Sequence, residues 1–178
     1  MPTTVMSGEE ITRAIRRMCH ELLELSAGSR DLVLLGIITR GEPLARRLAE
    51  ELEQAEGAAV PVGALDITMY RDDLYRQPTR PVGRTTLPCD IDDKVVVLVD
   101  DVLHSGRTVQ AALHALADLG RPRAIRLLTL VDRGGRELPI HADIVGKDLP
   151  TSKQERVTVQ VSEIDGEDAV RIEREDAQ

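Results

Sequence analysis

The stretch VVVLVDDVLHSGRT, from Val95 to Thr108, decides the fold. Its run of five apolar residues is typical of a strand that is buried on both faces, as in a parallel sheet. The run ends in two adjacent acids, Asp100 and Asp101, followed by a loop with a glycine, an arginine and hydroxyl side chains. The residues from Thr108 to Leu119 then form a helical pattern that a glycine ends. The stretch therefore predicts a buried strand, a polar loop and a helix.

The flanking sequence extends this alternation of strand and helix. Ser7 and Glu10 fit a capping box at the start of a helix that runs to about Leu25. Pro43 suits the first turn of a second helix, which Gly57 ends. Further strands are predicted at 31–38, around 60–70 and at 124–132, with a terminal hairpin formed by 155–164 and 168–175.

Strands that alternate with helices imply βαβ units. We therefore expect one α/β domain over residues 1–178, with a central, mostly parallel sheet flanked by helices and a small C-terminal hood at about 133–178.

Composition narrows the class of protein. No apolar run approaches the roughly 18 residues that a transmembrane helix needs, and the N-terminus lacks the pattern of a signal peptide. Cys19 and Cys89 lie far apart without a Cys/His cluster, so we expect reduced thiols in a cytoplasmic protein and no zinc site. The net charge of −8 argues against a nonspecific nucleic-acid binder, although a local basic face remains compatible with it. With Tyr70 and Tyr75 as the only aromatic residues, a base-stacking platform is nearly excluded.

Two loops fall where ligands bind in open α/β sheets, beyond the carboxyl ends of strands. One is Thr39-Arg40-Gly41, and the other runs from Asp100 to Thr108 into a helix N-terminus, which attracts anions. Neither GxxxxGK[ST] nor GxGxxG occurs in the chain. Acids beside an anion-binding loop suit a sugar phosphate, because carboxylates accept hydrogen bonds from sugar hydroxyls. Taken alone, the two acids could equally end a strand and start a turn.

The whole pattern resembles the type I phosphoribosyltransferases. The segments LDITMYRDDL, VDRGGRELPI, VGKDLPTSK and TRG extend the likeness along essentially the entire chain. Together they resemble the bacterial PyrR family, regulators of the pyrimidine operon that are also uracil phosphoribosyltransferases.

This resemblance implies a substrate site for phosphoribosyl diphosphate and uracil, occupied by UMP or UTP during regulation. Asp100 and Asp101 would bind the ribose hydroxyls, the following loop the 5′-phosphate, and Arg40 would neutralise the diphosphate leaving group; these three residues are the catalytic candidates. Mg²⁺ would be carried by phosphoribosyl diphosphate, with no direct protein ligand. The implied substrate-binding residues are Thr39, Arg40, Gly41, Val99, Asp100, Asp101, Val102, Leu103, His104, Ser105, Gly106, Arg107, Thr108, Arg133 and, through its backbone, Val157.

The polar segment from Arg71 to about Asp90 matches the family's mobile loop, which closes over the site and excludes water. A long stretch without periodicity in a compact domain is consistent with such a lid. Arg71, Arg76, Arg80 and Arg84 are unranked candidates for contacts to diphosphate. No strong general base is evident in the sequence.

The resemblance also implies binding of the pyr operon messenger RNA leader. Arg13, Arg16, Arg17 and His20 share a helical face. Thr39, Arg136, His141 and Lys147 match further positions of the family's RNA surface. The alternative is a solvated helix face partnered by glutamates. A homodimer, with tetramer or hexamer also open, would combine two basic faces.

Four positions depart from residues that relatives often carry: Gly135, His141, His104 and Ser105. The first two bear on RNA affinity, and Ser105 keeps the hydroxyl expected in the phosphate loop. Two other readings stay open: a purely metabolic purine or pyrimidine phosphoribosyltransferase without an RNA role, and a regulator with vestigial catalysis.

Overall fold

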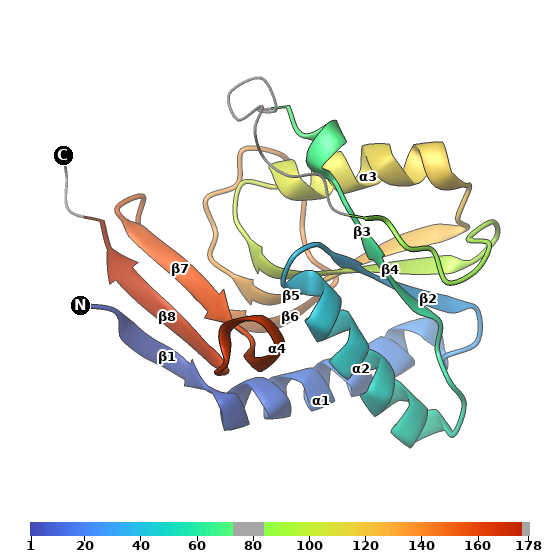
Figure 1. The fold of residues 1–178 in the computed structure, drawn as a ribbon, viewed down its shortest axis with the longest axis horizontal. Helices are drawn as coiled ribbons and strands as arrows, with labels where there is room; N and C mark the ends of the chain where they lie inside the picture. The colour runs from blue at the N-terminus through green and yellow to red at the C-terminus, as the bar shows by residue number, and fades with distance from the viewer. Residues whose placement is uncertain (73–83, 176–178) are drawn as a thin grey trace.

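The computed structural model describes residues 1–72 and 84–175, and its α/β architecture confirms the predicted fold class. Figure 1 shows a central sheet between helices and a smaller sheet beside it. The elements in chain order are β1 Thr3–Ser7, α1 Gly8–Ser26, β2 Leu32–Ile37, α2 Gly41–Glu56, β3 Val62–Leu65, the 3₁₀ turn η1 Thr68–Tyr70, β4 Val95–Leu103, α3 Arg107–Leu119, β5 Ala124–Asp132, β6 Ile144–Asp148, β7 Glu155–Gln160, α4 Ser162–Asp165 and β8 Ala169–Arg174.

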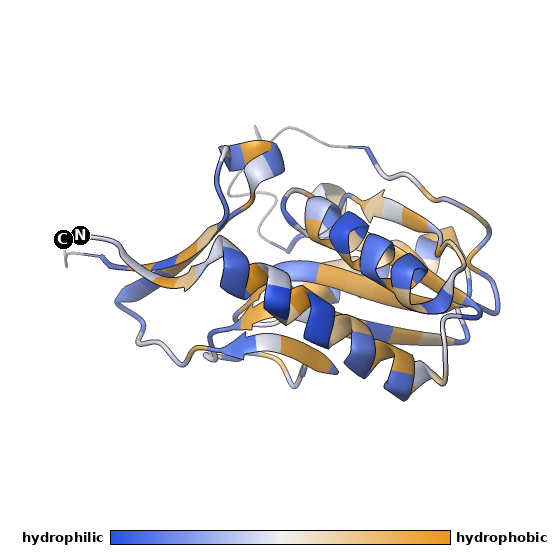
Figure 2. Cartoon of the chain, turned by 90° about the horizontal axis from the view of Figure 1, so that it is seen from below, coloured by the Kyte–Doolittle hydropathy of each residue, from blue (hydrophilic) through white to orange (hydrophobic). Residues whose placement is uncertain are grey.

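The central sheet has five strands in the order β3-β2-β4-β5-β6, and every neighbouring pair is parallel. Helices α1 and α2 cover one face and α3 covers the other (Figure 1). Because side chains alternate along a strand, Leu32 and Leu34 of β2 pack with α1 and α2, while Val33 and Leu35 pack on the side of α3. Much of this sheet is hydrophobic in Figure 2, and β2 is buried along its whole length.

The second sheet is antiparallel, in the order β1-β8-β7. The expected terminal hairpin is present as β7 and β8, but the short helix α4 lies between them and Gly166 ends it at φ 80°. β1, which precedes α1, adds to the far side of β8. Within residues 133–178, predicted as a hood, β6 pairs with β5 in the central sheet.

Several element boundaries differ from the sequence prediction. The strand expected to reach Tyr70 ends at Leu65, because the Asp66 carboxylate accepts hydrogen bonds from the backbone N–H and hydroxyl of Thr68 and turns the chain into η1. β4 continues past the predicted Val99 to Leu103, since its last residues still pair with β5.

Part of the predicted lid, residues 73–83 with Arg76 and Arg80, lies outside the described residues. The segment that follows is tied to the sheet. Thr86 forms an antiparallel bridge with Ala64, and the Thr85 hydroxyl accepts a hydrogen bond from the N–H of Asp66.

Candidate functional site

A pocket of about 200 Å³ opens where β2 and β4 end and α3 begins. It unites two loops that are some 60 residues apart in the chain, because β2 and β4 are neighbours in the parallel sheet and both end at the same edge. The lining residues are Ile37, Ile38, Thr39, Arg40, Ile67, Thr68, Arg71, Asp100, Asp101, Val102 and Thr108.

The two acids lie at the floor of this pocket. Asp100 is 8% exposed, and its Oδ1 accepts a hydrogen bond of 2.8 Å from the N–H of Asp101. Asp101 Oδ1 accepts one of 2.7 Å from the N–H of Val102. Burial, and then the charge of Asp101, raise the pKa of Asp100 well above its ordinary value. Carboxylates held at this edge offer acceptors to the hydroxyls of a bound sugar, and a cation or hydroxyl donor that arrives with a ligand would relieve their mutual repulsion.

The loop after the acids leads into the N-terminus of α3. Gly106 adopts φ 93°, a left-handed conformation that glycine reaches without steric cost, and it immediately precedes the helix. The Ser105 hydroxyl accepts a hydrogen bond from the N–H of Arg107. Thr108 in the first turn faces the pocket. The first N–H groups of a helix have no partner within the helix, so this end suits a phosphate group.

The second loop connects β2 to α2, and the peptide bond between Ile38 and Thr39 is cis. Gly41 begins α2 directly against β4. A Cβ on Gly41 would lie 2.3 Å from the carbonyl oxygen of Val99. Only glycine permits this approach, which brings the loop beside the acids.

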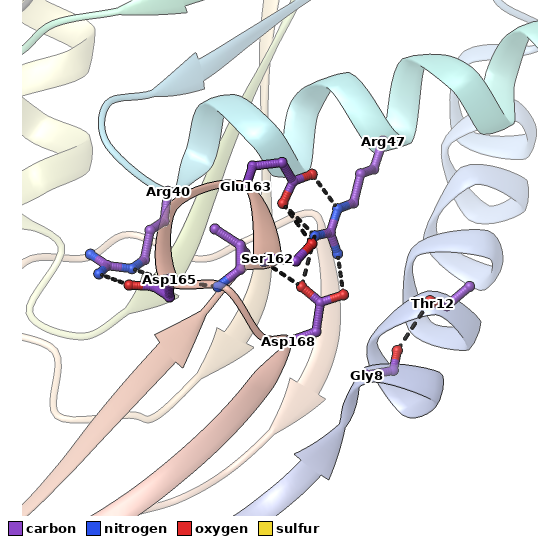
Figure 3. A network of polar contacts seen from close by, with 9 residues as sticks. Gly8, Thr12, Arg40, Arg47, Ser162, Glu163, Asp165 and Asp168 are labelled. Atoms are coloured by element: carbon purple, nitrogen blue, oxygen red, sulfur yellow. Dashed lines mark hydrogen bonds and ion pairs between the residues drawn. The ribbon is translucent and has the colours of Figure 1, made fainter.

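Arg40 lines the pocket and also contacts α4. Its Nε and Nη2 donate to the two carboxylate oxygens of Asp165, at 3.1 and 2.8 Å (Figure 3). This bond, reinforced by the charges of Asp165 and Asp101, raises the pKa of Arg40 despite its partial burial. The guanidinium therefore remains a cation at the mouth of the pocket.

Several other predicted substrate-binding residues do not line this pocket. Val99 and Leu103 are buried in β4. His104 Nδ1 donates to the carbonyl oxygen of Gly134 at 2.9 Å. The side chain of Arg107 bridges Asp72 and Glu137, which turns it toward neighbouring loops.

The two residues expected near the base do not line the pocket. Arg133 donates to the Thr151 hydroxyl and to the carbonyl oxygens of Ser152 and Glu155, so it braces the loop before β7. Val157 is buried in β7, whose other edge is not paired in the three-stranded sheet.

The predicted RNA-binding residues of α1 are exposed but point in different directions. Arg16 pairs with Glu51 of α2 at 3.5 Å. Arg17 bonds Glu21 and the carbonyl oxygens of Val145 and Gly146 in β6.

Arg13 and His20 make no hydrogen bond or ion pair among the described residues. Lys147 of β6 acts with Arg13 on the charge of Glu10, and so lies near the same end of α1. Because α1 packs against β6, the fold adds this lysine to the basic face.

The remaining candidates for RNA binding gather after β5 and at the pocket. Arg136 donates to both oxygens of Asp132 and to the carbonyl oxygens of His104 and Ile140. The pKa of Asp132 is lowered, mainly by its bonds to Arg136 and to a smaller extent by the nearby His141. Thr39 lines the substrate pocket.

Several residues that line the pocket were not predicted from the sequence. Ile37, Ile38, Ile67 and Thr68 enter it from the end of β2 and from η1. Thr68 belongs to the LDITMYRDDL segment, which contributes to the family resemblance. That resemblance was the feature of the sequence from which Thr68 could have been predicted.

No cluster of three or more His, Cys, Asp or Glu side chains within 1–72 and 84–175 could hold a metal ion. Within the same residues, no helix has the length and apolar character needed to cross a bilayer.

Comparisons with known proteins agree with this geometry. A family model described as phosphoribosyl transferase domain matches residues 3–163. The chain is 59% identical over 174 residues to the Bifunctional protein PyrR of Leifsonia xyli, covering 95% of each chain. It is 56% identical over 175 residues to that of Thermus thermophilus, covering 97% of each.

Solved structures show the same fold. The hypoxanthine phosphoribosyltransferase of Trypanosoma cruzi superposes with a TM-score of 0.72 over 98% of this chain and 97% of that one, at 18% identity. That identity is too low to carry a substrate from one protein to the other. Taken with the pocket at the ends of β2 and β4, the matches along the whole chain show that it belongs to the phosphoribosyltransferases and, among them, to the PyrR family.

Proposed function

We propose that this chain transfers the phosphoribosyl group of phosphoribosyl diphosphate to uracil, and that it also binds the messenger RNA leader of the pyrimidine operon in dependence on uridine nucleotides. The observation that carries the proposal is the single pocket lined by Arg40, Asp100, Asp101 and Thr108. These residues offer a cation, two sugar acceptors and a helix N-terminus within one site. The name of the relatives, Bifunctional protein PyrR, supports the pairing of two roles.

In the proposed reaction, a ring nitrogen of uracil bonds to the anomeric carbon as the bond from that carbon to diphosphate breaks. Positive charge develops on the ribose, and diphosphate leaves with the electron pair. Asp100 and Asp101 hold the ribose hydroxyls and lie where negative charge favours this transition state. Thr108 and the start of α3 hold the 5′-phosphate, and Arg40 stabilises the leaving group. Positioning and charge thus supply the catalysis.

Mg²⁺ is proposed to arrive with phosphoribosyl diphosphate. The chemistry of the pocket fits it, because Mg²⁺ usually keeps several of its waters, and Asp100 and Asp101 would stabilise it by their negative charge without being its direct ligands. When bound, the ion would neutralise charge on the diphosphate. Arg133 and the backbone of Val157 are proposed to complete the site on the side of the base.

The first test replaces both acids, as Asp100→Asn with Asp101→Asn. We expect phosphoribosyl transfer to uracil to fall at least about 100-fold, since each neutral amide loses the charge that favours the transition state. The melting temperature should hold or rise, because two adjacent like charges are removed and one of them belongs to the buried Asp100. Initial rates of UMP formation and a thermal melt measure both. Retained transfer would remove the acids from the proposed site.

For RNA, the basic side chains of Arg13, His20 and Lys147 are the proposed core of the binding face. The further proposed contacts are Arg16, Arg17, Arg136, His141 and Thr39. In a homodimer, two such faces would form one larger surface. A higher assembly is equally compatible with this arrangement.

The second test measures the affinity for the leader RNA of the host's own pyrimidine operon, at fixed salt, with and without UMP. Arg13→Ala should weaken binding several-fold, because each lost cation removes a phosphate contact. Arg46→Ala, an exposed arginine of α2 paired with Glu42, is the matched control and should bind normally. Uracil turnover without RNA binding would favour the alternative of a purely metabolic phosphoribosyltransferase.

A further inference from the structure

The contact between Arg40 and Asp165 joins the diphosphate loop to a segment far along the chain. Figure 3 shows the Arg40 guanidinium at the start of α2 beside α4, which lies between β7 and β8. The carboxylate of Asp165 bonds it at two points, through Nε and Nη2. The side chain of Asp165 is only 15% exposed, and that of Arg40 34%. A two-point bond between planar groups fixes orientation as well as distance.

This bond uses one edge of the guanidinium and leaves another. Nη1 makes no hydrogen bond among the described residues, and Arg40 lines the pocket beside Asp101. The guanidinium has five N–H donors in a fixed plane. A phosphate oxygen can therefore bond the Nη1 edge while Asp165 keeps the Nε edge.

Asp165 is itself held firmly. Its Oδ2 also accepts a hydrogen bond of 2.8 Å from the N–H of Val161, at the start of α4. About two turns further along α2, Arg47 donates to Glu163 and to both carboxylate oxygens of Asp168 (Figure 3). These bonds join α4 and the residues after it to α2 at a second point. Asp168 repeats the arrangement of Asp165, since its Oδ1 accepts from the N–H of Ser162.

We propose that Asp165 is a positioning residue for phosphoribosyl diphosphate: it holds the Arg40 guanidinium with its Nη1 edge turned to the diphosphate. The proposal rests on the proposed function, because it takes Arg40 as the diphosphate-binding cation. Without the carboxylate, the long arginine side chain samples other rotamers, and ordering it again costs binding free energy.

The test is Asp165→Asn, which preserves size and an acceptor for the N–H of Val161 but removes the charge. We expect the dissociation constant of phosphoribosyl diphosphate to rise about tenfold, through loss of preorganisation. The KM for uracil should stay unchanged, because the base is proposed to bind beside Arg133 and Val157 and not beside Arg40. Titration calorimetry of the whole chain with phosphoribosyl diphosphate and Mg²⁺ measures the first, and initial rates measure the second.

Two further variants separate positioning from general support of the fold. Asp168→Asn removes the equivalent charge from the Arg47 contact and should leave the affinity for phosphoribosyl diphosphate within about twofold, because Asp168 bonds Arg47 and not Arg40. In an Arg40→Ala background, Asp165→Asn should cause no additional loss, because the residue through which it acts is gone.

Unchanged or tighter binding by Asp165→Asn overturns the proposal, and tighter binding would mark Asp165 as a competitor of diphosphate. An equal loss in Asp168→Asn, or an additive loss in the Arg40→Ala background, assigns Asp165 to the fold instead. A wild-type chain that binds phosphoribosyl diphosphate but does not transfer its phosphoribosyl group to uracil contradicts the proposed function, while the binding series still decides the role of Asp165.

Discussion

At the scale of single residues, glycine and charge shape the site. Gly41 allows α2 to begin in contact with β4, and Gly106 turns the chain into α3. Asp100 is buried, and burial disfavours its ionised form and raises its pKa. Carboxyl groups whose pKa is raised by burial are common at functional sites. These residues place acids, a cation and a helix N-terminus around one small volume.

Gly41→Ala tests the close approach of α2 to β4. The added methyl would meet the Val99 carbonyl at 2.3 Å, so α2 must shift. We expect a loss of about 1–3 kcal/mol in the free energy of unfolding, as for overpacked sites, together with weaker binding of phosphoribosyl diphosphate.

Gly57→Ala is the comparison for that experiment. Gly57 has φ 74° but nothing within 4 Å of a new Cβ, so only the backbone penalty of about 1 kcal/mol applies. Urea unfolding measures both variants. Unimpaired substrate binding by Gly41→Ala would show that the loop tolerates a displaced α2.

At the scale of elements, local signals set where helices begin. The side chain of Ser7 accepts a hydrogen bond from the N–H of Glu10, and the Glu10 carboxylate accepts one from the N–H of Ser7. This capping box opens α1 immediately after β1. It therefore marks the point where the chain leaves the small sheet and crosses to the central one (Figure 1).

Ser7→Ala should lower the free energy of unfolding by about 1 kcal/mol, because a helix N–H loses its acceptor. Ser26→Ala, at the last residue of α1, is the control, since that side chain makes no hydrogen bond among the described residues. Equilibrium urea unfolding compares the two. An equal effect at both ends would mean that tertiary packing, and not the cap, sets where α1 begins.

At the scale of the whole molecule, ion pairs join α4, and with it the small sheet, to α2. Hydrogen bonds from arginine lower the pKa of Asp165 and of Glu163. The pKa of Asp168 is also lowered, because its bonds to Arg47 and to the N–H of Ser162 outweigh the opposing effect of burial. A carboxyl whose pKa is lower in the folded chain stabilises the fold above its unfolded pKa, and that stability is lost as the pH falls through the folded pKa.

Stability should therefore decline below pH 4.5, the higher of the ordinary values for these groups. Arg47→Gln should make this decline shallower, because Glu163 and Asp168 lose the partner that lowers their pKa. Arg46→Gln, on the same helix and paired with the half-buried Glu42, is the control. Urea unfolding across a pH series gives the slope for each chain. A slope in Arg47→Gln equal to that of the wild type would exclude these pairs as the source.

The sequence by itself determined the alternation of strands and helices, because apolar periodicity and caps act over a few neighbouring residues. It also predicted the two loops of the pocket, since a polar turn after a buried strand is a local pattern. It missed β1 and β6 and extended the strand at β3, where short segments depend on distant partners.

Only the tertiary structure decided which charges meet. Asp165 was predicted as part of a hairpin turn, yet α4 and α2 bring it to Arg40, 125 residues away in the chain. Likewise, Arg17 reaches the carbonyl oxygen of Gly146 because α1 packs on β6. Arginine reaches several partners, and the one it takes depends on how the surrounding elements pack, so no short window of sequence encodes these pairs.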